Sequence, residues 1–133
     1  MELSDDDLTY RVIGCYRWVY NEYGFGLLES AYQGALVHAC SKRGLRVERE
    51  VGVPFYFDGV VVANYRMDLV IERRLIVEIK SAESVHPAHV KQVLHYLRAT
   101  DFELGLLLNF GPKPMVKRFV LRNAVKHWRS GKA

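Results

Sequence analysis

Two short segments of this chain place charged side chains inside an otherwise apolar strand pattern. Apolar residues alternate with other residues over 65–71 and again over 75–81, which is typical of two neighbouring strands. Asp68 lies in the first segment, and Glu78 and Lys80 lie in the second. Because side chains alternate between the two faces of a strand, Glu78 and Lys80 share one face. A fold for this chain has to accommodate these charges within a sheet.

A three-residue loop at 72–74 would join the two strands in a hairpin and place Asp68 opposite Glu78. Directly opposed residues share a face with β-carbons about 4.5–5.5 Å apart, and like charges there are destabilising. A divalent cation would relieve this repulsion, because Mg²⁺ prefers hard oxygen ligands. With Lys80 one strand step beyond to hold or activate a water, the pattern indicates phosphodiester hydrolysis.

The spacing alone leaves a second interpretation open. A glutamate two residues before a lysine is common, and on an edge strand the two form a solvated, salt-bridged face. Glu29 adds a third carboxylate at the margin of the apolar stripe of a predicted helix. A carboxylate there is costly to bury unless it meets a cation. As a first-turn residue, however, Glu29 is equally favoured by the helix dipole.

A polar stripe flanks the apolar face of the last predicted helix. His89, Gln92 and Tyr96 form this stripe at helical spacing, and the last two lie one turn apart. Gln92 and Tyr96 can therefore reach the same phosphate or water, although an exposed edge of an amphipathic helix has the same pattern. His86 and His89 have no third ligand nearby, so we interpret them as surface polar residues.

Composition places the chain among ordinary globular proteins. It has 133 residues, of which 50% are hydrophobic and 26% charged, so we expect one domain with a real core. Cys15 and Cys40 lie on apolar helical stripes without a metal-binding spacing, which predicts buried thiols of a cytosolic protein. The acidic N-terminus lacks the features of a signal peptide, and the apolar stretch at 104–108 is too short to span a bilayer. We expect a cytoplasmic protein without membrane insertion.

The basic residues are unevenly placed, since no acidic residue follows Glu103. A segment with one sign of charge suits a polyanion such as a nucleic-acid backbone. A solvated basic tail that aids solubility explains the pattern equally well. The basic residues of this segment are Lys113, Lys117, Arg118, Arg122, Lys126, Arg129 and Lys132.

Periodicity and turn residues predict the order ααβββαββ. Ser4 is the expected N-cap of the first helix, Gly44 ends the second, and Asp58-Gly59 is a strong hairpin turn. This order predicts an α/β fold with a mixed sheet and helices packed on it. The predicted helices are 5–23, 27–42 and 87–99, and the predicted strands are 46–57, 60–72, 75–81, 102–110 and 115–121.

Four motifs together carry a family resemblance. Gly26-Leu-Leu-Glu29-Ser-Ala-Tyr32 resembles the Gly-x-x-Glu-x-x-Tyr signature of the bacterial GxxExxY protein family, a compact branch of the PD-(D/E)xK nuclease superfamily. Asp68 with Glu78-Ile79-Lys80 resembles the core motif of that superfamily. Gln92-Val-Leu-His-Tyr96 resembles the Gln-x-x-x-Tyr motif of its exonuclease-like branch. The resemblance covers about residues 8–122 and departs at Met67, where the core motif has proline.

The resemblance implies a restriction-endonuclease-like core, a mixed central β-sheet flanked by helices. It also implies a bound Mg²⁺ or Mn²⁺ ion. Asp68, Glu78 and the backbone carbonyl of Ile79 would be its ligands. Glu29 would reach the metal directly or through a water.

The resemblance also implies roles for the remaining motif residues. Lys80 would orient the attacking water or stabilise the transition state, and Gln92 and Tyr96 would position the scissile strand. Tyr32 would pack beside Glu29 and fix its rotamer.

We therefore predict a single nuclease-like domain, 1–133, with its core at about 8–122 and a basic C-terminal segment at 113–133. Its substrate would be DNA, bound with weak sequence selectivity, and a homodimer or a protein partner would supply further specificity. A non-catalytic nucleic-acid-binding or protein-interaction module with the same fold is the alternative. RNA ranks lower as a substrate, because no RNA-recognition signature is present. The predicted phosphate contacts are Lys113, Lys117, Arg118 and Arg122.

Overall fold

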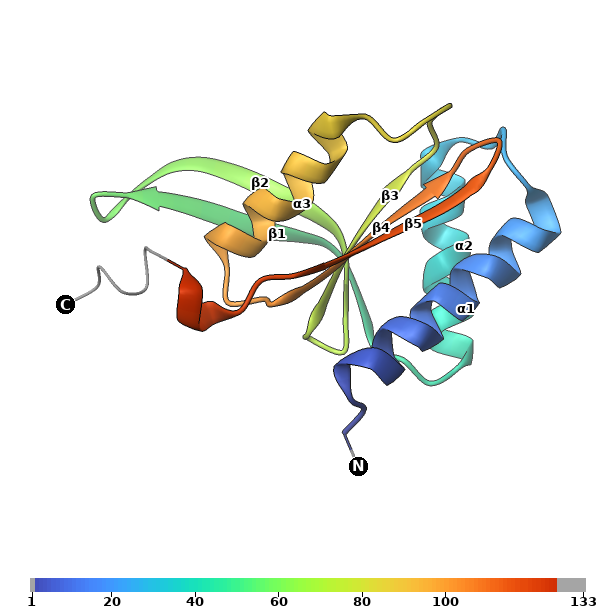
Figure 1. The fold of residues 1–133 in the computed structure, drawn as a ribbon, viewed down its shortest axis with the longest axis horizontal. Coiled ribbons are helices and arrows are strands. Elements are labelled where there is room, and N and C mark those ends of the chain that lie inside the picture. The colour runs from blue at the N-terminus through green and yellow to red at the C-terminus, as the bar shows by residue number, and fades with distance from the viewer. Residues whose placement is uncertain (1, 127–133) are drawn as a thin grey trace.

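A mixed five-stranded sheet with helices on both faces forms the core of the protein, as seen in a computed structural model that describes residues 2–126 (Figure 1). The strands follow the order β1-β2-β3-β4-β5, and all neighbours are antiparallel except β3 and β4. The helices are α1 (Asp5–Tyr23), α2 (Glu29–Lys42), α3 (Pro87–Ala99) and the short 3-10 helix η1 (Asn123–Val125). The strands are β1 (Val47–Phe57), β2 (Val60–Ile71), β3 (Leu75–Lys80), β4 (Leu104–Phe110) and β5 (Pro114–Val120).

The predicted order of elements and the predicted α/β class are confirmed, and every strand boundary lies within two residues of its prediction. Ser4 caps α1 as expected, because its Oγ accepts a hydrogen bond from the N–H of Asp7 at 3.1 Å. The second helix begins at Glu29 rather than at Leu27. The hydroxyl of Tyr32 accepts a hydrogen bond from the N–H of Leu27, which holds that residue in the loop before the helix. Within residues 2–126, no helix is long and apolar enough to cross a lipid bilayer.

The helices divide the core into two layers. Side chains of α1 and α2 pack with one set of sheet residues, which includes Leu69 and Val77. Side chains of α3 pack with the alternate set, which includes Val70 and Ile76. Since β3 and β4 are covered on both faces, they are apolar and buried almost throughout, as parallel strands in α/β folds usually are.

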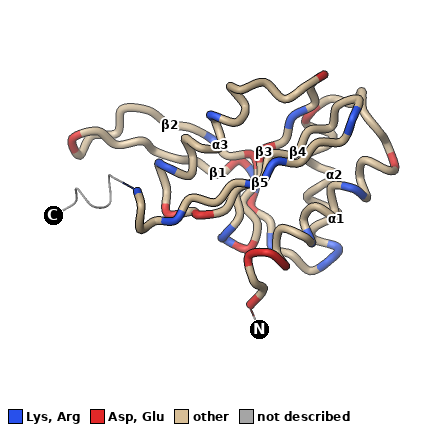
Figure 2. The backbone as a smooth tube through the Cα atoms, in the orientation of Figure 1, with Lys and Arg blue, Asp and Glu red and all other residues tan. Residues whose placement is uncertain are grey.

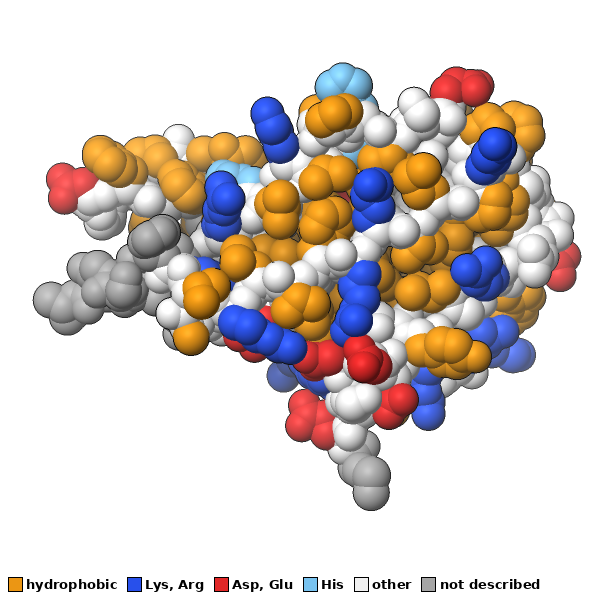
Figure 3. All heavy atoms as spheres, viewed as in Figure 1, with side chains coloured by type: hydrophobic (Ala, Val, Ile, Leu, Met, Phe, Trp, Pro, Cys, Tyr) orange, Lys and Arg blue, Asp and Glu red, His pale blue; other side chains and the backbone are white. Residues whose placement is uncertain are grey.

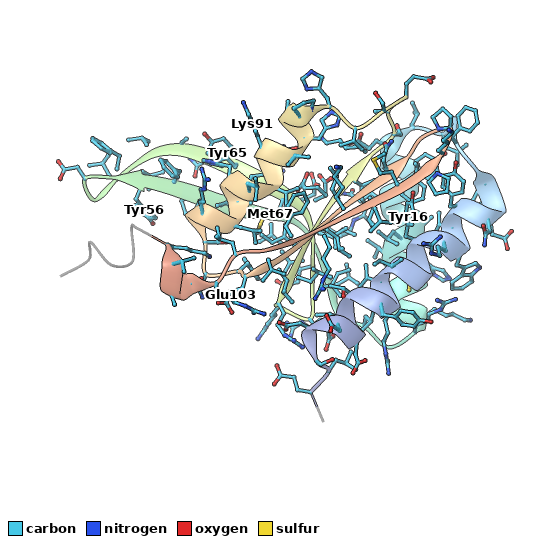
Figure 4. All side chains as sticks on the ribbon, viewed as in Figure 1. Tyr16, Tyr56, Tyr65, Met67, Lys91 and Glu103 are labelled. Atoms are coloured by element: carbon cyan, nitrogen blue, oxygen red, sulfur yellow. The ribbon has the colours of Figure 1, made fainter. Side chains whose placement is uncertain are left out.

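The strand alternation breaks at Asp68. Met67 packs beside α3 in the same layer as Val70, although strict alternation from Leu69 places Met67 on the opposite face (Figure 4). The paired residues of β1 and β2 pass from Arg49↔Leu69 to Val51↔Met67 and leave out Glu50, which has a φ of 50°. A non-glycine residue in this left-handed region interrupts a strand locally. The alternation expected over 65–71 therefore fails at Met67.

The ends of β1 and β2 form a hairpin that projects beyond the helices (Figure 1). Its turn, Asp58-Gly59, has φ values of 53° and 73°, as expected for a hairpin turn that needs two left-handed residues. Side chains beside the turn are exposed, including Phe57 at 72% and Val60 at 60%. The predicted hairpin turn is confirmed.

A buried amide joins the end of the sheet to the loop after β3. The side chain of Asn109, 2% exposed, donates to the carbonyl of Ala82 at 3.0 Å and accepts from the N–H of Ala82 at 2.9 Å. Gly111 lies against the same carbonyl, and a Cβ added there would be 2.3 Å from the oxygen of Ala82. The close approach of these two backbones therefore requires glycine at 111.

We predict that Gly111→Ala lowers the free energy of unfolding by about 1–3 kcal/mol, because the backbone at Ala82 has to move to admit the methyl group. The matched control is Gly34→Ala in α2, where an added Cβ meets nothing within 4 Å. That change should raise stability by about 0.5–1 kcal/mol, since glycine is a poor helix former. Urea unfolding followed by circular dichroism measures both values. A Gly111→Ala protein as stable as the parent contradicts the close contact.

A candidate active site between strands β2 and β3

Two carboxylates meet where the ladder between β2 and β3 ends. The last pair of the ladder is Leu69↔Val77, and the same register places Asp68 opposite Glu78. At this point side chains replace the usual backbone partners. The N–H of Asp68 donates to Glu78 Oε1 at 3.1 Å, and the N–H of Ile79 donates to Asp68 Oδ2 at 2.8 Å. The hairpin register predicted from the loop at 72–74 thus brings the two acids together.

Burial and mutual repulsion shift the titration of this pair. Glu78 is 1% exposed. Its burial, followed by the nearby charge of Asp68, raises its pKa to about 8. Burial likewise raises the pKa of Asp68, against the opposing effect of the hydrogen bond from the N–H of Ile79. The two carboxyl groups therefore titrate as a coupled pair, and their closeness disfavours the state in which both are ionised.

Glu29 and Lys80 lie beside this pair at the ends of their elements. Glu29 is the first residue of α2, and its carboxyl accepts a hydrogen bond from the backbone of Ser81. Partial burial of that carboxyl raises its pKa, and the charge of Lys80 opposes the shift. Lys80, the last residue of β3, is half-buried and also lowers the pKa of Asp68 and Glu78. Three carboxyl groups and one ammonium group are therefore electrostatically coupled here.

Gln92 and Tyr96 lie on α3, on the side of the sheet that α3 covers. Gln92 Nε2 donates to the hydroxyl of Tyr96 at 3.1 Å, and this hydroxyl donates to the carbonyl of Arg66 at 2.9 Å. Tyr96 is only 2% exposed. Its burial, and next the charge of Glu78, raises its pKa. Gln92 and Tyr96 are thus joined by a hydrogen bond, as the sequence predicted that they lie together. The hydroxyl of Tyr96 also links α3 to β2 at Arg66, two residues before Asp68.

Tyr32 lies under the loop that leads into Glu29. Its hydroxyl donates to the carbonyl of Gly24 at 2.8 Å and accepts from the N–H of Leu27 at 3.1 Å. Its ring stacks on Phe110 with centroids 4.1 Å apart. These contacts fix the start of α2, so they hold the backbone that carries Glu29.

Sequence reasoning missed two polar residues beside Asp68. Gln33, one turn after Glu29 on α2, donates from Nε2 to Glu50 Oε2 at 3.0 Å and to the carbonyl of Asp68 at 3.4 Å. Glu50 occupies the irregular position of β1, and its charge contributes to the raised pKa of Asp68. The i, i+4 spacing from Glu29 to Gln33 was the available signal. Nothing in the sequence marks the left-handed backbone of Glu50.

The predicted phosphate-contact residues differ in their surroundings. Arg118 pairs with Asp6 at 2.6 Å, and Arg122 pairs with Asp5 at 3.1 Å. Lys113 lies just before β5 and Lys117 lies on it, and both side chains are exposed. The sequence reading of the basic segment overlooked that the acidic start of α1 lies beside it.

Lys126, a further residue of that basic segment, is less exposed than the sequence suggested. Lys126 is buried, and its Nζ donates to the carbonyls of Thr100 and Phe102, each at 2.8 Å. Arg129 and Lys132 lie outside the described residues. Lys and Arg are spread over many elements rather than gathered on β5 (Figure 2), and on the face drawn in Figure 3 one group of acidic side chains lies near the N-terminus.

The histidine pair has a structural use at the start of α3. His86 Nδ1 accepts a hydrogen bond from the N–H of Ala88, and His89 Nδ1 accepts one from the N–H of His86. Together they form a reciprocal cap.

The donor set of the acidic pair suits a hard divalent cation. Within residues 2–126, no three His, Cys, Asp or Glu side chains are grouped closely enough to hold a metal by themselves. Mg²⁺, however, commonly keeps several waters and takes only one or two carboxylates. The carboxyls of Asp68, partly buried, and Glu78, fully buried, supply such a pair, because a cation would offset their repulsion. These residues therefore fit the expected ion.

Comparison with known proteins gives the class of the chain. The family model of the PD-(D/E)XK nuclease superfamily matches residues 6–119. The chain belongs to this superfamily, and its mixed sheet with flanking helices is consistent with a restriction-endonuclease-like fold.

No curated protein matches the chain. Among solved structures, the crystal structure of SSO0001 is similar, with 22% identity and a TM-score of 0.42. The match covers 81% of this chain and 63% of that one.

The raised pKa of Glu78 predicts how stability depends on pH. Its pKa is about 8 in the folded protein against an ordinary 4.5, so the folded state binds more protons between these values. The free energy of unfolding of the metal-free protein should therefore fall as pH rises from about 5 to 8, by at most about 1.4 kcal/mol per pH unit from this group.

Glu78→Gln should flatten this fall, whereas Glu22→Gln on the exposed end of α1 should leave it unchanged. Urea unfolding at several pH values in the presence of EDTA measures the slopes. Equal slopes in the parent and Glu78→Gln proteins would rule out the raised pKa.

Proposed function

We propose that the protein is a metal-dependent nuclease that hydrolyses DNA phosphodiester bonds. The observation that carries this proposal is the meeting of Asp68 and Glu78 at the end of the β2–β3 ladder, with Lys80 next to them. Membership of the nuclease superfamily supports the reaction class. The motif at Gly26–Tyr32 supports assignment to its GxxExxY branch.

Asp68 and Glu78 would hold Mg²⁺ or Mn²⁺, and Glu29 would reach it directly or through a water. The carbonyl of Ile79 is a further ligand of the proposed site. Its N–H points toward Asp68, and the N–H and C=O of one strand residue point to the same neighbouring strand. When bound, the ion lowers the pKa of a coordinated water and offsets charge on the phosphate.

Lys80 would hold the attacking water or stabilise the negative charge that develops on the phosphate. Gln92 would contact the scissile strand, because its carboxamide lies on the hydroxyl of Tyr96 beside the acidic pair. Tyr96 would act mainly through position, since its hydroxyl is bonded to the carbonyl of Arg66. Tyr32 would keep Glu29 in place through the preceding loop.

We infer that DNA is bound chiefly through its phosphates, with weak sequence selectivity. The net charge of +4 and the exposed side chains of Lys113 and Lys117 favour a polyanion. Arg118 and Arg122 would have to bind phosphate while they are also paired with Asp6 and Asp5. We further infer one domain that acts in the cytoplasm, with a homodimer or a protein partner as the source of any specificity.

We predict that Lys80→Met and Asp68→Asn each lower the rate of metal-dependent DNA cleavage by about 100-fold or more, as expected for loss of a group that assists the reaction. Lys91→Met, on the exposed face of α3, should retain the parent rate (Figure 4). Linear, circular and single-stranded DNA, each with Mg²⁺ or Mn²⁺, are the substrates to compare on gels. Cleavage that survives in both site variants defeats the catalytic assignment.

A non-catalytic module that keeps the fold is the second candidate, and metal binding separates it from the nuclease. We predict that Mn²⁺ raises the melting temperature, because a ligand at about 100 times its Kd adds about 2.7 kcal/mol. Glu78→Gln should abolish the increase, and Glu22→Gln should retain it. A melting temperature that Mn²⁺ leaves unchanged in the parent protein favours the module.

A further inference from the structure

A groove of about 430 Å³ lies along α1, apart from the acidic pair. Its residues come from the middle of α1 and from the end of α2. The groove is lined by Tyr10, Arg11, Ile13, Gly14, Arg17 and Arg43. Arg43 directly follows α2, whereas Glu29 begins it, so the 14-residue helix separates the groove from the acidic site by roughly 20 Å.

Among residues 2–126, the groove is lined by three arginines and by no carboxylate. Arg11, Arg17 and Arg43 take part in none of the ion pairs formed within residues 2–126, whose arginines are 73, 74, 118 and 122. Three arginines at one groove make its lining positively charged, which favours an anion. Arginine binds phosphate through two parallel charge-assisted hydrogen bonds.

The position of Arg43 is fixed before any ligand arrives. Its guanidinium lies over the ring of Trp18, 4.8 Å from the centroid, and its Nη1 is 3.9 Å from Cys15 Sγ. A Cβ at Gly14 would come within 3.4 Å of the same Nη1. The guanidinium of Arg43 therefore lies directly against the backbone of α1. A side chain that is already ordered loses less entropy on binding.

The rest of the groove offers apolar surface. Tyr10, which is 79% exposed, and Ile13 lie one turn apart on α1 and both line the groove. Small-molecule sites typically have volumes of about 300–1,000 Å³ and combine apolar walls with a few polar groups. An aromatic wall next to several arginines suits a planar ring joined to a phosphate.

We propose that this groove binds a phosphate-bearing ligand of nucleotide size, with its phosphate on Arg11, Arg17 and Arg43 and its ring against Tyr10 and Ile13. The ligand is either a free nucleotide or one nucleotide unit of a nucleic-acid strand, since both present the same chemistry. The site is independent of hydrolysis at Asp68 and Glu78.

Titration calorimetry of the full chain in EDTA tests the site, with AMP, adenosine, pyrophosphate and a short single-stranded oligonucleotide as probes. Arg11→Gln/Arg17→Gln is the main variant, because it preserves the contact between Arg43 and Trp18. It should weaken binding of AMP or of the oligonucleotide about tenfold or more, while Arg98→Gln on the exposed side of α3 should have no effect. Tyr10→Ala should weaken AMP more than pyrophosphate.

The probes also identify the source of the phosphate. If AMP binds as tightly as the oligonucleotide, the ligand is a free nucleotide; if the oligonucleotide binds much more tightly, the ligand is a strand. Either result supports the site, provided that Arg11→Gln/Arg17→Gln weakens the binding. Three outcomes overturn the proposal: no phosphate-bearing probe binds, adenosine binds as tightly as AMP, or Arg11→Gln/Arg17→Gln binds as the parent does. None of these readouts depends on DNA cleavage.

Discussion

The pairing of β2 with β3 is the constraint on which the rest of the site depends. Its backbone ladder stops at Leu69↔Val77. Beyond this pair, the carboxylates of Asp68 and Glu78 each accept a hydrogen bond from a backbone N–H of the opposite strand. Each acid is thereby held in a defined position, with Glu78 fully buried and Asp68 partly buried. Such an arrangement is unfavourable for two negative charges, so it favours uptake of a proton or of a cation.

Several elements converge on this pair from different parts of the chain. The start of α2 contributes Glu29, and its next turn contributes Gln33, which is bonded to the carbonyl of Asp68. From the other face, α3 is joined to β2 through Tyr96. The two layers of the core thus meet at one irregular point of the sheet, where strand alternation breaks between Met67 and Leu69.

Much of this could be predicted from the sequence. Alternating apolar residues and the loop at 72–74 were sufficient to place Asp68 opposite Glu78, because hairpin register follows from loop length. Contacts that depend on tertiary structure were not predictable. The left-handed backbone of Glu50 has no sequence signal, and the pairing of Arg118 with Asp6 joins residues from opposite ends of the chain. Local patterns carry no information about such partners.

The side chain of Asn109 has a consequence for the chain that follows Lys80. Its amide holds both backbone groups of Ala82 from within the core, two residues after the lysine. The segment that leads to α3 is therefore clamped at its origin, and any swing of that segment has to begin beyond residue 82. The same two bonds also restrain the backbone that carries Lys80.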